Sequence, residues 1–259
     1  MRTRCWTRWV PSCLAIAAAL LAFPGTAKAA DWKFSVTPYF WAADISLDAK
    51  VNGNTVLATD VDVSDLMDKL DMAFFAHTEM YTDKGGFFFD GSWMQLSSGD
   101  TRSGGGLASG TRVDTDLSLG TYELGAFYHP TKPGTGFDVL FGIRVISLSQ
   151  DIDFELPNGN ETGTTTDSSL TDAFVGLRAG GPLGGNWDLM VRGDVGTGDT
   201  ELTWNALGTV GFHFGSKGQF GARFGWRQMT IHQKDTGSQT TVESTITMKG
   251  PLAGLTLTF

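Results

Sequence analysis

The sequence predicts an all-β chain that folds into a single antiparallel transmembrane β-barrel of about ten strands. Three features support this fold class. After the first 29 residues, apolar residues alternate with small or polar ones in successive segments. Short turns alternate with longer polar connections, and the chain ends on an aromatic residue of an apolar strand face. A barrel in a bilayer combines these features, because only every second residue of each strand faces lipid.

The C-terminal segment GPLAGLTLTF carries the strongest of these signals. Its apolar residues Leu255, Leu257 and Phe259 alternate with glycine and threonine up to the last residue. The ends of soluble domains usually fray into water, whereas the last strand of a closed barrel pairs with the first and meets hydrocarbon. We therefore predict that 240–259 pairs with 31–42, and that Leu255, Leu257 and Phe259 form an assembly signal.

The N-terminus has the pattern of a cleaved secretory signal peptide. Three arginines in the first eight residues precede an apolar run over 14–23, and Ala27-Lys28-Ala29 then provides an A-x-A cleavage site. The apolar run is shorter than the roughly 20 residues of a membrane-spanning helix. We predict that 1–29 is removed and that 30–259 is a single outer-membrane β-barrel domain.

The composition excludes several classes of function. Cys5 and Cys13 both lie in the predicted signal peptide, so the mature chain has no disulfide, thiolate metal site or cysteine nucleophile. Removing four of the 19 basic residues leaves 15 against 28 acidic residues, a net charge of −13, which disfavours nucleic acid as a partner. We predict no cofactor and no metal site. The acidic run 60–65 lacks the glycine and closing glutamate of an EF-hand loop, and Walker, GxSxG and HExxH motifs are missing.

Ten strands are predicted from the alternation, at 31–42, 72–83, 86–97, 112–129, 137–154, 168–180, 187–196, 201–215, 218–232 and 240–259. Between the first two strands, Asn52-Gly53-Asn54 predicts a hairpin of 45–51 with 55–62. Ser64 is expected to cap a short helix over 64–71. The number of strands becomes twelve if the hairpin joins the wall, and eight if 187–196 is not a strand.

The connections predict the orientation of the barrel. Those after the even-numbered strands are short, whereas most of those after the odd-numbered strands are longer and acidic, such as 45–71, 98–111 and 155–167. Outer-membrane barrels have short periplasmic turns and longer outer loops, so we place both termini in the periplasm. A soluble periplasmic barrel is the rival fold.

Splitting each strand by parity gives an apolar face and a polar face. The apolar face, which includes Phe87, Phe141, Leu177 and Phe224, is predicted to face lipid. The polar face carries charges of both signs, which we expect to pair across the lumen because a buried unpaired charge is costly. The predicted network is Glu79, Asp90, Glu123, Arg144, Asp172, Arg178, Arg192, Asp194, Arg223 and Arg227. These long side chains predict a filled lumen or a narrow path, unlike the lumen of the wide porins.

Four segments resemble small, uncharacterised outer-membrane barrel proteins of Gram-negative bacteria: WKFSVTPYFWAA at 32–43, SDLMDKLD at 64–71, SLTDAFVGLR at 169–178 and GPLAGLTLTF at 250–259. The resemblance implies an outer-membrane location but no catalytic residue. We expect membrane lipid, lipopolysaccharide and the outer-membrane insertion machinery as partners. Ten strands is also the count of the outer-membrane aspartyl protease family, but its paired Asp-Asp and Asp-His motifs are not recognisable here.

Three functions are compatible with the sequence. The leading one is a structural or narrow-channel barrel that passes small solutes or contributes to envelope integrity. The first alternative is an outer-membrane hydrolase acting on lipid or peptide, with His232, near the outer end of its strand, as the candidate catalytic residue. The second is a surface adhesin or binding barrel that uses 45–71 and 98–111.

Overall fold

The computed structural model describes residues 32–104, 107–130, 136–155, 161–215, 218–236 and 240–259. Lys33–Phe259 form one compact unit, and the fold is described for that unit. The predicted signal peptide lies outside the described residues. Within them, no helix is long and apolar enough to cross a membrane.

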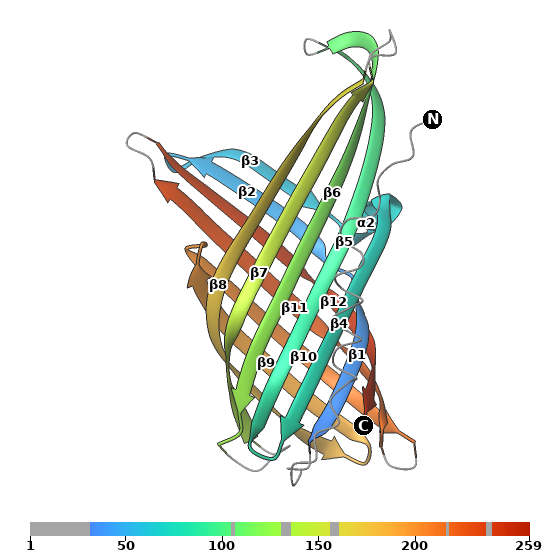
Figure 1. Ribbon diagram of the computed structural model, residues 1–259, viewed down its shortest axis with the longest axis vertical. Helices are drawn as coiled ribbons and strands as arrows, with labels where there is room; N and C mark the ends of the chain where they lie inside the picture. Colours follow the sequence, from blue (N-terminus) through green and yellow to red (C-terminus); the bar gives the residue numbers. More distant parts are fainter. Residues whose placement is uncertain (1–31, 105–106, 131–135, 156–160, 216–217, 237–239) are drawn as a thin grey trace, which may run out of the picture. The chain divides into compact units, whose positions relative to one another are not determined.

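Ten antiparallel strands form a closed barrel, as the sequence predicts (Figure 1). They are β1 (Lys33–Trp41), β4 (Leu70–Thr82), β5 (Gly85–Gly104), β6 (Leu107–Tyr128), β7 (Gly136–Glu155), β8 (Glu161–Gly184), β9 (Trp187–Gly198), β10 (Leu202–Phe214), β11 (Phe220–Thr236) and β12 (Thr241–Thr258). From β4 onward each strand pairs with the next along the chain, and β1 lies between β4 and β12. The predicted fold class and the count of ten barrel strands are confirmed.

The two ends of the chain meet in the closing ladder. Val36 of β1 lies opposite Leu257 of β12. The Phe259 N–H donates to the Phe34 carbonyl at 2.8 Å, the Phe34 N–H donates back to the Phe259 carbonyl at 3.3 Å, and the two rings stack 6.2 Å apart. The predicted pairing of 240–259 with 31–42 is therefore confirmed, and the last residue is held in the sheet.

Two of the predicted outer loops are largely strand. β5 and β6 continue through most of 98–111, while β7 reaches Glu155 and β8 begins at Glu161. These segments are rich in Ser, Thr, Gly and Asp, so they lack the apolar alternation by which a strand is recognised. Their backbones pair in the β5–β6 and β7–β8 ladders, which lengthens these hairpins beyond the sequence-based boundaries.

The predicted outer hairpin is present as β2 (Asp44–Val51) and β3 (Asn54–Val61). Asn52 and Gly53 form its turn with positive φ angles of 51° and 79°, as this turn type requires. β2 pairs with the outer half of β12, beyond the part of β12 that pairs with β1. The hairpin thus adds two strands to the sheet, and the barrel itself closes without it.

An unpaired stretch separates the β1–β4 ladder from the β2–β3 ladder. The β1–β4 ladder ends with Pro38 opposite Ala76, and the β2–β3 ladder begins with Ile45 opposite Val61. Six residues, 39–44, therefore face fourteen residues, 62–75. The extra chain includes helix α2 (Val63–Lys69), which covers the interruption.

Helix α2 differs in detail from the prediction. Its N-cap is Asp62 and not Ser64, and Asp62 makes no capping bond through its side chain. Instead, Asp44 of β2 accepts the Val63 N–H at 2.8 Å, so a contact between elements replaces the local cap. Leu66 is the buried residue of the helix, whereas Met67, which the sequence places on the same apolar side, is half exposed.

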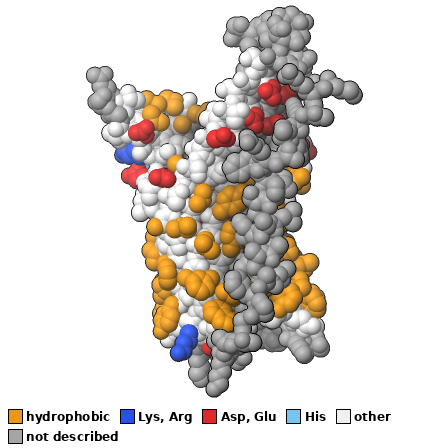
Figure 2. Space-filling view, viewed as in Figure 1, with side chains coloured by type: hydrophobic (Ala, Val, Ile, Leu, Met, Phe, Trp, Pro, Cys, Tyr) orange, Lys and Arg blue, Asp and Glu red, His pale blue; other side chains and the backbone are white. Residues whose placement is uncertain are grey.

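The outside of the barrel carries an apolar band. Predicted lipid-facing residues are exposed on it, among them Phe87, Phe141, Leu177 and Phe224, with exposed fractions of 54–58%. Figure 2 shows hydrophobic side chains gathered over the lower part of the barrel and most carboxylates near its upper end.

Candidate functional site: a lumen charge network above an open chamber

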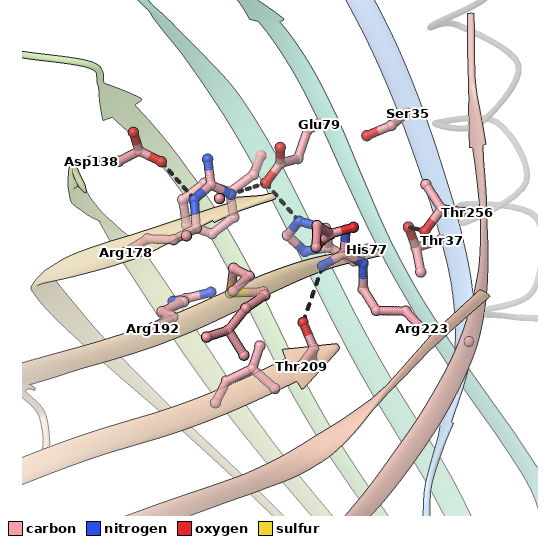
Figure 3. Close-up of a pocket in the computed structure, with 18 of the residues that line it drawn as sticks. Ser35, Thr37, His77, Glu79, Asp138, Arg178, Arg192, Thr209, Arg223 and Thr256 are labelled. Carbon is pink, nitrogen blue, oxygen red and sulfur yellow. Dashed lines mark hydrogen bonds and ion pairs between the residues drawn. The ribbon is translucent and has the colours of Figure 1, made fainter. Parts of the chain in front are cut away.

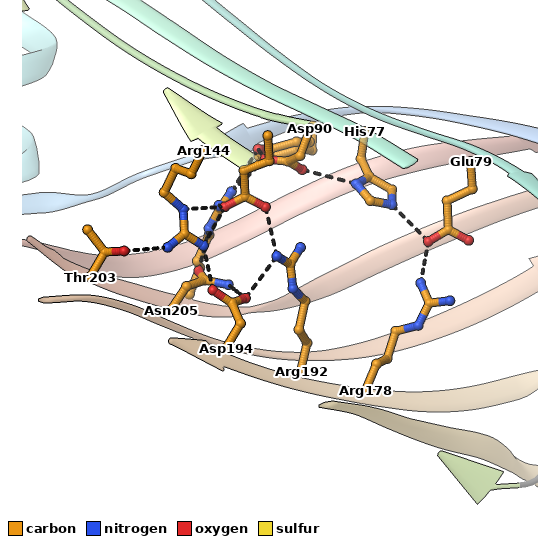
Figure 4. Close-up of polar contacts among 12 residues, drawn as sticks. His77, Glu79, Asp90, Arg144, Arg178, Arg192, Asp194, Thr203 and Asn205 are labelled. Carbon is orange, nitrogen blue, oxygen red and sulfur yellow. Dashed lines mark hydrogen bonds and ion pairs between the residues drawn. The ribbon is translucent and has the colours of Figure 1, made fainter. Parts of the chain in front are cut away.

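The centre of the lumen is a fully buried ion cluster. Glu123 of β6 and Arg144 of β7 have no exposed surface. The Arg144 Nε donates to the Glu123 Oε1 at 2.9 Å, its Nη1 donates to the Thr203 hydroxyl at 3.0 Å, and its Nη2 pairs with Asp194 of β9 (Figure 4). One guanidinium thereby joins side chains from three other strands.

Two further arginines widen this cluster. Nη2 of Arg192 lies 2.7 Å from Glu123 and 2.8 Å from Asp194. Nη1 of Arg227 lies 3.0 Å from Asp90, and its Nε donates to Asn205 at 3.0 Å. Tyr39, Thr203 and Asn205 complete the hydrogen bonding. The last two are absent from the sequence-based set, although their parity on β10 marks them as lumen-facing.

A branch runs from Asp90 toward the short-turn end of the barrel. His77 of β4 contacts Asp90 through Nδ1 at 3.1 Å and Glu79 through Nε2 at 3.0 Å. Ionised carboxylates only accept hydrogen bonds, so a ring nitrogen that carries a proton donates to the carboxylate that it faces. Arg178 then joins Glu79 to Asp138. The Arg178 Nε lies 2.7 Å from the Asp138 Oδ2.

The two remaining predicted members lie apart from this cluster. Arg223 pairs with Asp188 at 3.1 Å and donates to the Thr209 hydroxyl at 3.1 Å. Asp172 accepts hydrogen bonds from the Thr200 N–H at 3.1 Å and from its hydroxyl at 2.7 Å, and so holds the β9–β10 connection. Eight of the ten predicted residues therefore form the central cluster and its branch. Arg223 pairs separately with Asp188, and Asp172 holds the β9–β10 connection.

Glycines on neighbouring strands make room for the phenylalanine rings on which the arginine guanidinium groups pack. A Cβ on Gly125 would lie 2.5 Å from the Phe88 ring, and one on Gly142 would lie 2.8 Å from the Phe174 ring. The Arg192 guanidinium lies 5.0 Å from the Phe88 ring and 5.6 Å from the Phe174 ring, within range of cation–π attraction.

A layer of apolar side chains closes the lumen on the outer side of the network. Along β11, Met229 and Ile231 follow Arg227 toward the outer turn, and along β7 Ile146 follows Arg144. These residues belong to one buried cluster, composed of Trp41, Ala43, Phe75, Met94, Leu119, Ile146, Met229, Ile231 and Met248. Two successive layers of buried side chains, one charged and one apolar, therefore occupy this part of the lumen.

On the other side of the network, the lumen holds an open chamber of about 570 Å³ (Figure 3). Its lining includes Gly181, Pro182 and Asn186 near the β8–β9 turn, so the chamber lies at the short-turn end of the barrel. Figure 3 shows Asp138, Arg178 and Arg192 on one side of the chamber, and Ser35, Thr37 and Thr256 on the other.

His232, the candidate catalytic residue, belongs to a surface cluster outside the lumen. Its Nδ1 lies 2.9 Å from the Thr245 hydroxyl and its Nε2 lies 3.3 Å from Glu201. Thr245 sits within β12 between β11 and β2, opposite His232 and Asp48, so ladders flank its backbone on both sides.

The described part of the chain contains no cluster of three or more His, Cys, Asp or Glu side chains that could hold a metal ion.

Sequence comparison identifies no relative of this chain. No protein-family model matches it, and no curated protein does.

Comparison of structures does find similar folds. The outer-membrane protease OmpT from Escherichia coli is 9% identical over 91% of this chain and 99% of its own, with a TM-score of 0.53. The attachment invasion locus protein Ail of Yersinia pestis is 10% identical over 85% of this chain and 97% of its own, but the TM-score of 0.31 supports no argument. The chain thus shares a barrel fold with an outer-membrane protein, and at this identity the likeness concerns the fold alone.

Proposed function

We propose that this protein is a non-conducting outer-membrane barrel with a structural role in the cell envelope. The observation that carries the proposal is the complete burial of Glu123 and Arg144 in the middle of the lumen. Solute passage needs a continuous path of water along the lumen. Buried, mutually paired charges leave no room for that path at this level.

The apolar layer supports the same conclusion. Met229, Met248 and Ile231 are at most 2% exposed. A solute that passed the charge network would next meet a packed layer of methionine, leucine and aromatic side chains. Opening the barrel would therefore require both layers to rearrange, which favours a structural role over passage of small solutes.

The proposal includes a location and an orientation. The outer apolar band would contact membrane lipid, with lipopolysaccharide around the long hairpins and the short turns in the periplasm. Cleavage after Ala29 would release the mature chain, and the insertion machinery would recognise Leu255, Leu257 and Phe259 at its end.

Planar bilayer recordings test the closed lumen. The purified mature protein is expected to show no conductance steps of porin size, because the ion cluster seals the lumen. A trimeric porin in the same bilayer serves as the positive control. Steps of porin size from the protein itself would contradict the proposal.

A deletion variant tests whether helix α2, and not the charge network, closes the lumen. Removing eight residues, 62–69, equalises the two sides of the unpaired stretch and takes away α2 with Leu66. The charge network stays in place, so this variant should remain non-conducting. Conductance that appears only in the deletion variant would show that α2 seals the lumen, and would refute the assignment to Glu123 and Arg144.

A further inference from the structure

Arg192 lines the inner end of the open chamber, and only 6% of its side chain is exposed. Its Nη2 is engaged by Glu123 and Asp194, whereas its buried Nε–H has no hydrogen-bond acceptor among the residues that the structure describes. Buried donors are almost always paired in folded proteins, so an unpaired guanidinium N–H calls for a specific explanation.

The surroundings hold this guanidinium in place. The Phe88 and Phe174 rings lie on it at 5.0 and 5.6 Å, and the two ion pairs of Nη2 fix its direction. A fixed guanidinium loses little conformational entropy when a planar or tetrahedral oxyanion binds, and its donors match such a group.

The negative charges of the carboxylates that line the chamber are compensated, because each forms an ion pair with an arginine, so they repel a bound anion only weakly. Glu79 contacts Arg178 and His77, Asp138 contacts Arg178, and Asp188 contacts Arg223. Arg223 and Arg178 in turn keep 23% and 16% of their side chains exposed. On the facing wall, the Thr37 and Thr256 hydroxyls bond each other at 2.8 Å, so that one of the two can donate to a ligand, and Ser35 adds a further hydroxyl.

We propose that the chamber is a binding site for a small oxyanion, a carboxylate or a phosphate, with Arg192 at its inner end and Arg223 on its wall. The volume of about 570 Å³ admits a ligand of metabolite size. That the ligand comes from the periplasm rests on the proposed orientation. The binding itself does not, and it does not depend on whether the barrel conducts.

Titration calorimetry of the mature protein in detergent micelles tests this site. Sodium phosphate and sodium acetate are titrated separately, with sodium chloride keeping the ionic strength constant. Saturable binding of one anion per barrel is expected for at least one of the two, and the stronger one identifies the ligand class. Arg192→Gln should weaken it about tenfold, which corresponds to about 1.4 kcal/mol. Lys234→Gln, which removes a positive charge outside the chamber, should leave the affinity unchanged.

A second variant keeps the test decisive if Arg192→Gln does not fold. Arg223→Gln leaves the central cluster intact, because Arg223 contacts only Asp188 and Thr209 among the described polar contacts. It should weaken the same anion several-fold. If neither anion binds saturably, or if both chamber variants bind as tightly as the wild type, the proposal is overturned. Conductance measurements decide the proposed function independently.

Discussion

Replacing Arg144 with methionine is expected to lower the free energy of unfolding of the barrel substantially. The change removes one of the two guanidinium groups that Glu123 and Asp194 share at the buried centre of the lumen, and leaves them only that of Arg192 to share. Breaking a buried ion pair by removing one partner costs about 3–5 kcal/mol, while domains of ordinary stability have about 5–15 kcal/mol in total. Urea unfolding in detergent, followed by tryptophan fluorescence, should show a transition at much lower denaturant concentration.

The matched control is Lys234→Met, which also removes one partner of an ion pair. Lys234 lies 3.1 Å from Glu243, but both side chains are substantially exposed. Water solvates the remaining carboxylate there, so little change in the unfolding midpoint is expected. Equal midpoints for Arg144→Met and wild type would mean that the central cluster does not stabilise the barrel.

Deleting Phe259 should sharply reduce the amount of assembled protein in the outer membrane. The residue contributes both hydrogen bonds of the last pair in the closing ladder and a ring stacked on Phe34. Its side chain is 71% exposed, so packing within the barrel does not account for an aromatic residue at this position. Assembly is measured as the fraction that migrates as a compact, heat-modifiable species on gels without boiling.

Two controls distinguish a terminal signal from general destabilisation. Phe259→Tyr keeps the ring and the backbone bonds and should assemble nearly as well as the wild type. Deleting 100–111 shortens the β5–β6 hairpin at its outer end and should also be tolerated. Assembly of the Phe259 deletion at the wild-type level would remove Phe259 from the proposed signal.

Alternation of side chains was sufficient to predict the barrel, but pairing inside the lumen was not predictable from it. Parity places Arg144 on the inner face, and Arg144 lies directly opposite Asp172 in the β7–β8 ladder. Its guanidinium bonds Glu123, which lies opposite it in the β6–β7 ladder, and also Asp194 on β9, two strands away. The tilt of the strands and the closure of the barrel decide which charges on non-adjacent strands meet across a lumen, and the alternation of residues specifies neither.

The local errors of prediction have a common physical origin. Ser64 fits the N-cap pattern, yet Asp44 from a neighbouring strand takes the Val63 N–H. The polar outer segments of β5–β8 lack alternation, yet pairing within the β5–β6 and β7–β8 hairpins keeps them extended. In both cases a contact with another strand outweighs the local propensity. The unpaired Nε of Arg192 was unpredictable for the same reason, since it depends on what the other strands fail to supply.

The unpaired stretch between the β1–β4 and β2–β3 ladders separates the barrel wall from the β2–β3 hairpin, so the hairpin can change in length without shifting the register of the wall. β1 keeps its register through β12 and β4, and the ladder resumes at Ile45 only after eight more residues have been inserted on one side than on the other. Insertions, deletions or a foreign epitope between 45 and 69 therefore leave the pairing of Pro38 with Ala76 unshifted. The segment is therefore a suitable point for grafting a foreign sequence, because the pairing that closes the barrel wall does not pass through it.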